Sequence, residues 1–133
     1  MKNMLLAVAA ILVALTLPSA ASAQCVIFED PAEAFKIADM VFVGRVVSNE
    51  PTGNSGSHVT THIATFRLER SWKGPPDRQI RVGSDAPLEV GKRYVVFAAG
   101  KPLFSSIQCD WAIAVERAKR KLDWLSTKRS RPG

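Results

Sequence analysis

The eight residues from Met40 to Val47 constrain the fold of this chain most. They read Met-Val-Phe-Val-Gly-Arg-Val-Val, an almost wholly apolar run that is rich in β-branched side chains. The run is too short for a typical helix, so it predicts a central strand. Gly44 inside it indicates a bulge or a sharp bend.

Four further strands are expected after this one. Residues Glu50 to Ser57 are rich in Pro, Gly, Asn and Ser, which predicts a mobile loop. The next strand should run from Thr60 to Trp72, because apolar Ala64, Phe66 and Leu68 alternate with polar residues and so define one buried and one wet face. Three shorter strands, separated by turns that contain Gly or Pro, are expected at Arg78–Val82, Arg93–Ala99 and Leu103–Cys109.

Two helices are expected outside the sheet. Residues 31–38 form the first, with Asp30 as N-cap and Pro31 at the first helical position. The second should begin near Asp110, which is placed to cap it. Its apolar stripe follows the helical period, at Trp111, Val115, Ala118, Leu122 and Leu125. The fold class is therefore mainly β: a small five-stranded closed barrel with a short N-terminal helix and a C-terminal amphipathic helix. A two-sheet sandwich of the same strands is the competing arrangement.

The first 23 residues have the features of a cleavable secretory signal. Lys2 supplies a positive start, the run from Met4 to Leu17 is mostly apolar, and Pro18 precedes a small-residue Ala21-Ser22-Ala23 site. The apolar run is shorter than the roughly 20 residues of a membrane span. Gln24 is not small, which argues against lipidation at Cys25. We therefore expect a secreted or periplasmic chain that begins at Gln24 and has no transmembrane segment after cleavage.

Removing 23 of the 133 residues leaves 110, a suitable length for one domain with a single core. Both cysteines, Cys25 and Cys109, remain after cleavage. In an oxidising compartment, two cysteines near opposite ends of a domain most simply pair with each other. In the chain-entropy model, closing a loop of that length contributes about 4–5 kcal/mol before native strain is subtracted.

The positive charge is concentrated at the C-terminal end. Residues 116–133 hold seven basic and two acidic residues, a net charge of +5, whereas the ten basic and ten acidic residues from 24 to 115 cancel. A basic end can attract an anionic polymer, and its candidate contacts include Arg117, Lys119, Arg120 and Lys121. The favoured interpretation is a solvated helix face followed by a frayed terminus, and residues 128–133 are expected to form a basic disordered tail.

Catalytic and metal-binding motifs are not apparent. His58 and His62 are the only histidines, and on a strand about 13 Å would separate them, too far for one metal ion. The serines lack a nucleophile elbow. Two of the three tryptophans fit the core, Trp111 on the helical stripe and Trp72 in the inward register of Phe66 and Leu68. The role of Trp124 stays open. No enzyme activity, cofactor or metal site is expected.

Three segments together carry a resemblance to a known family. They are Met40 to Val47, the stretch Phe66 to Gly74 that ends in Trp-Lys-Gly, and the stretch Val90 to Ala98 that contains Gly-Lys-Arg-Tyr. With Cys25 near the mature N-terminus and Cys109 at a strand end, they resemble bacterial secreted proteins similar to the netrin-like, tissue-inhibitor-of-metalloproteinases (TIMP) type of OB-fold. The resemblance implies an OB-like barrel domain over residues 24–127.

The resemblance also implies functions. Animal TIMP-type proteins inhibit zinc proteases by placing the amino group and carbonyl of an N-terminal cysteine on the metal, whereas here Gln24 precedes Cys25. The leading hypothesis is therefore an exported, non-enzymatic module that binds a protein or envelope partner, with Gln24 and Cys25 among its candidate contacts. Inhibition of the TIMP type is the first alternative. Binding of an anionic polymer or nucleic acid through the basic end is the second, and export disfavours nucleic acid.

Cys25 and Cys109 should form one intramolecular disulfide in protein recovered from the exported fraction. Intact mass after alkylation, with and without prior reduction, measures both the number of free thiols and the N-terminal residue. We expect no alkylation before reduction, two additions after it, and a chain that starts at Gln24. Two reactive thiols in unreduced protein, or a lipid on Cys25, would contradict this expectation.

Overall fold

The computed structural model describes residues 29–54, 60–100, 104–105 and 111–133. The expected signal segment, both cysteines, Gln24, His58 and Asp110 lie outside these residues. The described elements are two α-helices, one 3₁₀ helix and seven strands, in the order α1 Pro31–Ile37, β1 Met40–Pro51, β2 His62–Lys73, β3 Gln79–Ser84, β4 Arg93–Ala98, β5 Phe104–Ser105, β6 Ala112–Ala114, η1 Val115–Arg117, α2 Lys119–Leu125 and β7 Arg131–Pro132.

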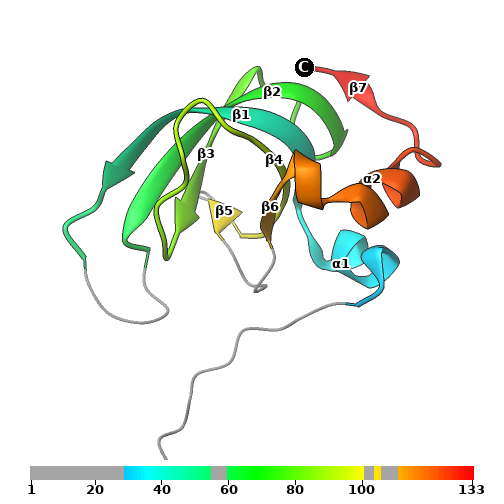
Figure 1. Ribbon diagram of the computed structural model, residues 1–133, viewed down its shortest axis with the longest axis horizontal. Coiled ribbons are helices and arrows are strands. Elements are labelled where there is room, and N and C mark those ends of the chain that lie inside the picture. Colours follow the sequence, from blue (N-terminus) through cyan, green and yellow to red (C-terminus); the bar gives the residue numbers. More distant parts are fainter. Residues whose placement is uncertain (1–28, 55–59, 101–103, 106–110) are drawn as a thin grey trace, which may run out of the picture.

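The chain is mainly β, as the sequence predicts, and β1 is a central strand (Figure 1). The sheet order is β5-β3-β2-β1-β4-β6, and β7 pairs with β2 outside this path. The pairings are antiparallel except for the parallel pair of β3 and β5. The prediction of a closed five-stranded barrel differs from this arrangement. In the described residues, β5 and β6 form the two edges of an open sheet and do not pair with each other.

Two apolar clusters lie on opposite faces of β1. The inner cluster contains alternate residues of four strands, among them Phe42, Phe66, Val82 and Val96, all of which are fully buried. The outer cluster joins Val41 and Val43 of β1 and Val95 and Phe97 of β4 to the two helices. Because the first half of β1 and most of β4 are covered on both faces, apolar residues occupy every position from Met40 to Val43 and from Tyr94 to Ala98.

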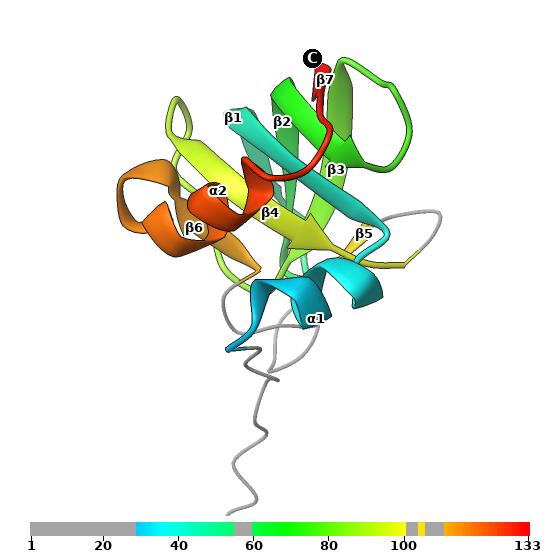
Figure 2. The same ribbon diagram turned by 90° about the vertical axis from the view of Figure 1, so that its right-hand side faces the viewer.

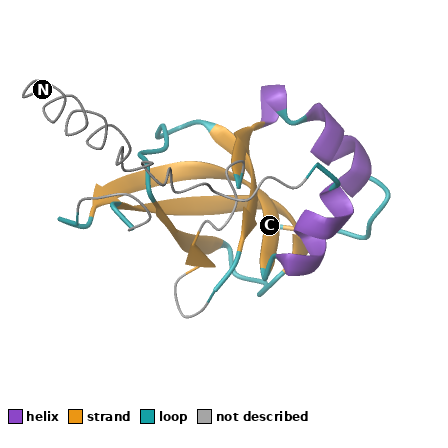
Figure 3. Ribbon diagram, turned by 90° about the horizontal axis from the view of Figure 1, so that it is seen from below, coloured by secondary structure: helices purple, strands orange, loops and turns teal. Residues whose placement is uncertain are grey.

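Both helices lie on the same side of the sheet (Figures 2 and 3). The N-cap prediction for α1 is confirmed, since the Asp30 carboxylate accepts a hydrogen bond from the Ala32 amide at 2.9 Å. At the other end of α1, the Lys73 ammonium donates to the carbonyl oxygens of Phe35 at 2.8 Å and Lys36 at 3.3 Å. A basic side chain at the last carbonyls stabilises a helix C-terminus.

The prediction of one helix from Trp111 to Leu125 is wrong in its first half. Residues 112–114 form β6, which pairs with β4, and α2 begins only at Lys119. Trp111 therefore belongs to the inner cluster, whereas Leu125 belongs to the outer one. The apolar spacing from Trp111 to Leu125 is that of a helix, but spacing alone does not show whether two residues pack in the same cluster. Here Trp111 precedes a short edge strand and Leu125 lies on a helix, so the two side chains are buried in different clusters.

The C-terminal residues, which we expected to be disordered, continue the edge of β2. Arg131 pairs with Ser71 and Pro132 pairs with Arg70, and the Gly133 amide donates to the Glu69 carbonyl at 3.1 Å. β3 pairs with β2 only as far as Arg67, which leaves these backbone groups of β2 available to the tail. No helix among the described residues is both long and apolar enough to cross a membrane.

Leu125→Ala should lower the free energy of unfolding by about 2–5 kcal/mol, because this side chain is 0% exposed within the outer cluster. Leu122→Ala is the matched control. Leu122 is only partly buried in the same helix, so its truncation should cost less. Urea denaturation of the three proteins makes the comparison. Equal losses, or a loss below about 0.5 kcal/mol for Leu125→Ala, would show that α2 does not pack as described.

Candidate functional site

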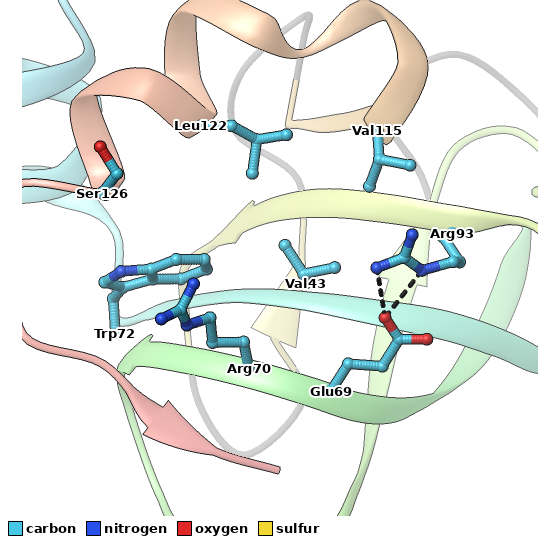
Figure 4. Close-up of a pocket in the computed structure, with 8 residues that line it drawn as sticks. All are labelled: Val43, Glu69, Arg70, Trp72, Arg93, Val115, Leu122 and Ser126. Atoms are coloured by element: carbon cyan, nitrogen blue, oxygen red, sulfur yellow. Dashed lines mark hydrogen bonds and ion pairs between the residues drawn. The ribbon is translucent and has the colours of Figure 1, made fainter.

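A pocket of about 400 Å³ lies on the outer face of the sheet, below η1 and α2 (Figure 4). Residues from three strands and from the C-terminal helical segment line it: Val43, Glu69, Arg70, Trp72, Arg93, Val115, Leu122 and Ser126. Val115 and Leu122 point toward Val43, so apolar side chains form the interior between the sheet and the helix. The charged side chains of Glu69, Arg70 and Arg93 lie at the border of the pocket.

Irregular pairing between β1 and β2 explains why so many β2 side chains reach this pocket. Gly44 pairs with Leu68 and Val43 pairs with Arg70, so Glu69 is an extra residue on β2. Trp72 is extra in the same way, between the partners of Phe42 and Val41. An extra residue changes the face to which the following side chains point. Arg70 and Trp72 therefore lie on the outer face, although they share the parity of the inward residues Phe66 and Leu68.

Gly44 takes part in the irregularity that the sequence predicts there. A Cβ atom at this position would lie 3.0 Å from the Arg67 carbonyl oxygen and 3.0 Å from the Phe42 ring. Contacts this short leave no room for a side chain unless its neighbours shift. The pairing is irregular at this position, as the register shift between Val43 and Gly44 shows, but the extra residue is Glu69 of β2 rather than a residue of β1.

The Trp-Lys-Gly stretch has a separate structural role at each position. Trp72 lines the pocket and Lys73 holds the C-terminus of α1. Gly74 has a φ of +105°, and a Cβ there would collide with the sulfur of Met40. Glycine is therefore required both by the left-handed backbone and by the close approach.

Glu69 holds together two arginines that project from neighbouring strands. Its Oε2 atom accepts from Arg93 Nε at 2.7 Å and lies 2.6 Å from Arg93 Nη2 (Figure 4). Arg45 Nε lies 3.8 Å from the other carboxylate oxygen, and Arg45 Nη1 donates to the Gly91 carbonyl at 2.6 Å. The three side chains are 31–43% exposed, so each ion pair contributes only about 1 kcal/mol or less.

Arg70 is an exposed residue that lines the pocket. Its Nε atom donates to the Ser130 hydroxyl at 2.8 Å, and the guanidinium carbon lies 5.7 Å from the centre of the Trp72 ring. No carboxylate among the described residues pairs with it. A guanidinium has five N–H donors, so the Nη groups remain able to bind an anion.

The basic residues singled out in the C-terminal segment have different surroundings. Arg117 and Arg120 are exposed, and Lys119 pairs with Asp123 on the same helix. Lys121 is buried, with its ammonium 4.7 Å from the centre of the Phe97 ring. Its aliphatic chain and its charge therefore support packing of α2 on the sheet.

The remaining sequence candidates have structural surroundings of their own. Trp124 packs edge-on against Phe35 of α1 with ring centres 5.3 Å apart. His62 Nδ1 lies 2.9 Å from the Thr61 hydroxyl, within hydrogen-bond distance. In the described part of the chain, no three His, Cys, Asp or Glu side chains are grouped so as to hold a metal ion.

Sequence reasoning missed the charged border of this pocket. Arg45, Glu69, Arg70 and Arg93 were treated as the wet positions of strands or as part of a neutral body. Alternation with apolar residues indicates that Arg45, Glu69 and Arg93 face away from the inner core, whereas Arg70 reaches the outer face only through the irregular pairing of β2. Pairing between strands far apart in the sequence brings the four side chains together.

Glu69→Gln should destabilise the protein by about 1 kcal/mol at low salt, because Arg45 and Arg93 are opposite each other in the β1–β4 pair and would lose their shared counter-charge. The deficit should shrink at high salt, since salt screens the remaining repulsion. Glu50→Gln, an exposed change on β1 without an ion pair in the described residues, is the control. Denaturant titration at two salt concentrations provides the measurement, and equal effects of the two changes would contradict the assigned role of Glu69.

Comparison with known proteins adds no family assignment. No family model matches the chain. A search of curated proteins finds no match either. The functional interpretation therefore depends on the residues and geometry of the site itself.

Proposed function

We propose that this chain is an exported, non-enzymatic binding module, and that its ligand enters the pocket between α2 and the outer face of the sheet. The observation that carries the proposal is the combination of an apolar interior with the Arg70 guanidinium at its border, which has no carboxylate partner among the described residues. Binding sites are commonly concave and mostly apolar, with a few polar groups that orient the ligand. This pocket has that composition.

The ligand should carry one compact apolar group and one anionic group. A volume of about 400 Å³ lies near the lower end of the range for ligand pockets. Val43, Val115 and Leu122 suit an aliphatic or aromatic side chain, and Arg70 suits a carboxylate. These are features of a segment of a protein partner or of an envelope component, and neither requires a cofactor.

A binding role is favoured over catalysis by the state of the polar groups in the pocket. Both carboxylate oxygens of Glu69 are already engaged, one by Arg93 and the other by Arg45, so this side chain is committed to ion pairs within the sheet. Ser126 is the hydroxyl in the lining, and no histidine is among the lining residues. A hydroxyl nucleophile needs an adjacent base, so these groups do not form a hydrolytic pair.

We further propose that the open sheet is part of an OB-like barrel. Its two edges, β5 and β6, belong to one continuous stretch of chain between residues 104 and 114. One end of this stretch pairs with β3 and the other with β4. A single segment that bridges both edges would close the sheet through the covalent chain, as in the partly open barrels of the OB type.

Export and the single disulfide belong to the same proposal. The secretory features of residues 1–23 support a secreted or periplasmic location, and pairing of Cys25 with Cys109 would staple the segment before α1 to the segment between β5 and β6. TIMP-type inhibition through the N-terminus is the alternative that the resemblance suggests. It would use Gln24 and Cys25, which lie outside the described residues.

Arg70→Gln should remove the preference of the pocket for an anionic ligand. The probes are N-acetyl-leucine and its neutral amide, titrated against isotope-labelled protein by NMR. In the parent, we expect shifts at Trp72 and Leu122 and about tenfold tighter binding of the carboxylate, since a hydrogen bond to a charged group contributes about 1.5–3 kcal/mol. In Arg70→Gln, both probes should bind with equal, weak affinity.

Arg78→Gln serves as the matched control, because Arg78 is an exposed arginine in the turn before β3. It should preserve the preference for the carboxylate. Shifts confined to other parts of the protein, or the same preference in Arg70→Gln as in the parent, would refute the pocket as the ligand site.

A further inference from the structure

Four arginines lie across four neighbouring strands on the outer face of the sheet. Arg45 of β1 pairs in register with Arg93 of β4 on one side and with Arg67 of β2 on the other. Arg81 of β3 pairs with Thr65, one step along the same face of β2. We call these four residues, Arg93, Arg45, Arg67 and Arg81, the arginine row. The row crosses about three strand spacings, roughly 14 Å.

The row is an unusual concentration of charge for a sheet surface. Like charges directly opposite each other on adjacent strands destabilise the pairing. Glu69 offsets this repulsion for Arg45 and Arg93. Arg67 and Arg81 are exposed and have no ion-pair partner in the described part of the chain. Four arginines and one glutamate leave a net charge of +3 across the row.

The helices leave the β2–β3 half of this face uncovered. The outer cluster contains core residues of β1 and β4 together with the two helices, and β3 contributes none to it. α2 has only seven residues, and it packs over β4 rather than β3 (Figure 2). The polar side chains of Thr65, Arg67, Gln79 and Arg81 accordingly alternate with inward apolar residues, as expected for a sheet face open to solvent.

The row and the pocket form one continuous surface. Arg93 belongs to both, and Glu69 connects it to Arg45. Val43 at the pocket and Arg45 in the row are two residues apart on β1, about 7 Å along the strand on the same face. A ligand held in the pocket can therefore reach the row within a few covalent bonds.

We propose that this surface binds an acidic linear segment of a partner protein, with one apolar residue in the pocket and the following carboxylates along the arginine row. The anchoring part of this inference depends on the proposed function of the pocket. Charge complementarity identifies the remainder, because guanidinium groups match carboxylates in bidentate geometry. An apolar anchor next to the charges favours a peptide over a uniformly charged polymer.

Two blocked peptides test the inference on the purified protein: acetyl-Leu-Glu-Glu-Glu-Glu-amide and the same peptide with Gln in place of each Glu. We expect the Glu peptide to bind at least tenfold more tightly at 50 mM salt. Most of this preference should disappear at 300 mM salt, since exposed charges are screened. Equal affinities of the two peptides at low salt would overturn the proposal.

The double variant Arg67→Gln/Arg81→Gln locates the interaction. It should bind the Glu peptide about tenfold more weakly and melt no lower than the parent, because neither arginine has an ion-pair partner in the described structure. Arg117→Gln/Arg120→Gln removes the same charge from the C-terminal helical segment and should change the affinity less than twofold. If both double variants lost the same affinity for the Glu peptide, the preference would be a general effect of net charge, and the arginine row would be refuted as a binding site.

N-acetyl-leucine separates this inference from the proposed function. It should bind Arg67→Gln/Arg81→Gln as tightly as it binds the parent, because neither arginine lines the pocket. Weaker binding of the Glu peptide alone in this variant would therefore support the arginine row. Unchanged binding of the Glu peptide would refute the row and leave the proposed function of the pocket standing. A heparin tetrasaccharide and an oligothymidylate test the other classes of anionic partner. The assignment of a protein partner would be overturned if either of them bound the parent more tightly than the Glu peptide does and lost affinity by the same factor in Arg67→Gln/Arg81→Gln.

Discussion

Burial of β1 on both faces is the constraint on which the rest of the structure depends. Its inward side chains form the inner cluster with β2, β3 and β4, and its outward side chains form the floor on which the helices pack. Apolar burial contributes about 25 cal/mol per Å², so a strand that is apolar on both faces favours an arrangement with cover on each side. α1 and α2 supply the outer cover at one end only. The pocket lies where this cover begins, and the arginine row lies just beyond it.

The extra residues in β2 convert this scaffold into a candidate binding surface. A strictly alternating β2 would direct Arg70 and Trp72 toward the inner cluster, where an unpaired guanidinium would be costly. The irregular pairing at Glu69 and Trp72 instead directs both side chains toward α2. The same irregular region separates from β3 after Arg67, and β7 pairs there with β2. One local departure from regular pairing thus shapes the pocket and anchors the C-terminal residues beside it.

The pocket and the row suggest recognition by two complementary kinds of interaction. The pocket offers apolar contact area and the row offers charge, and Arg93 and Glu69 connect the two. Electrostatic attraction mainly increases encounter and discriminates among partners, whereas a buried apolar anchor slows dissociation. This division is what the proposed binding module would need in order to select one segment of a larger partner. The basic residues of the C-terminal helix contribute less, because Lys121 packs on Phe97 and Lys119 pairs with Asp123.

The sequence by itself determined the features that depend on local pattern. The apolar run at Met40 to Val47, the alternation in β2 and the Asp30-Pro31 helix start each depend on neighbouring residues. The central strand, the solvent-exposed face of β2 and α1 were therefore predictable. Only the tertiary structure decided the rest. Trp72 lies on the outer face because β2 pairs irregularly with β1. Residues 111–125 divide into a strand and a short helix because residues 112–114 pair with β4. Arg93, Arg45 and Arg67 lie side by side because of the register between segments that are distant in the sequence. Such register is set by the packing of whole strands, and a shift of one residue would direct each side chain to the opposite face.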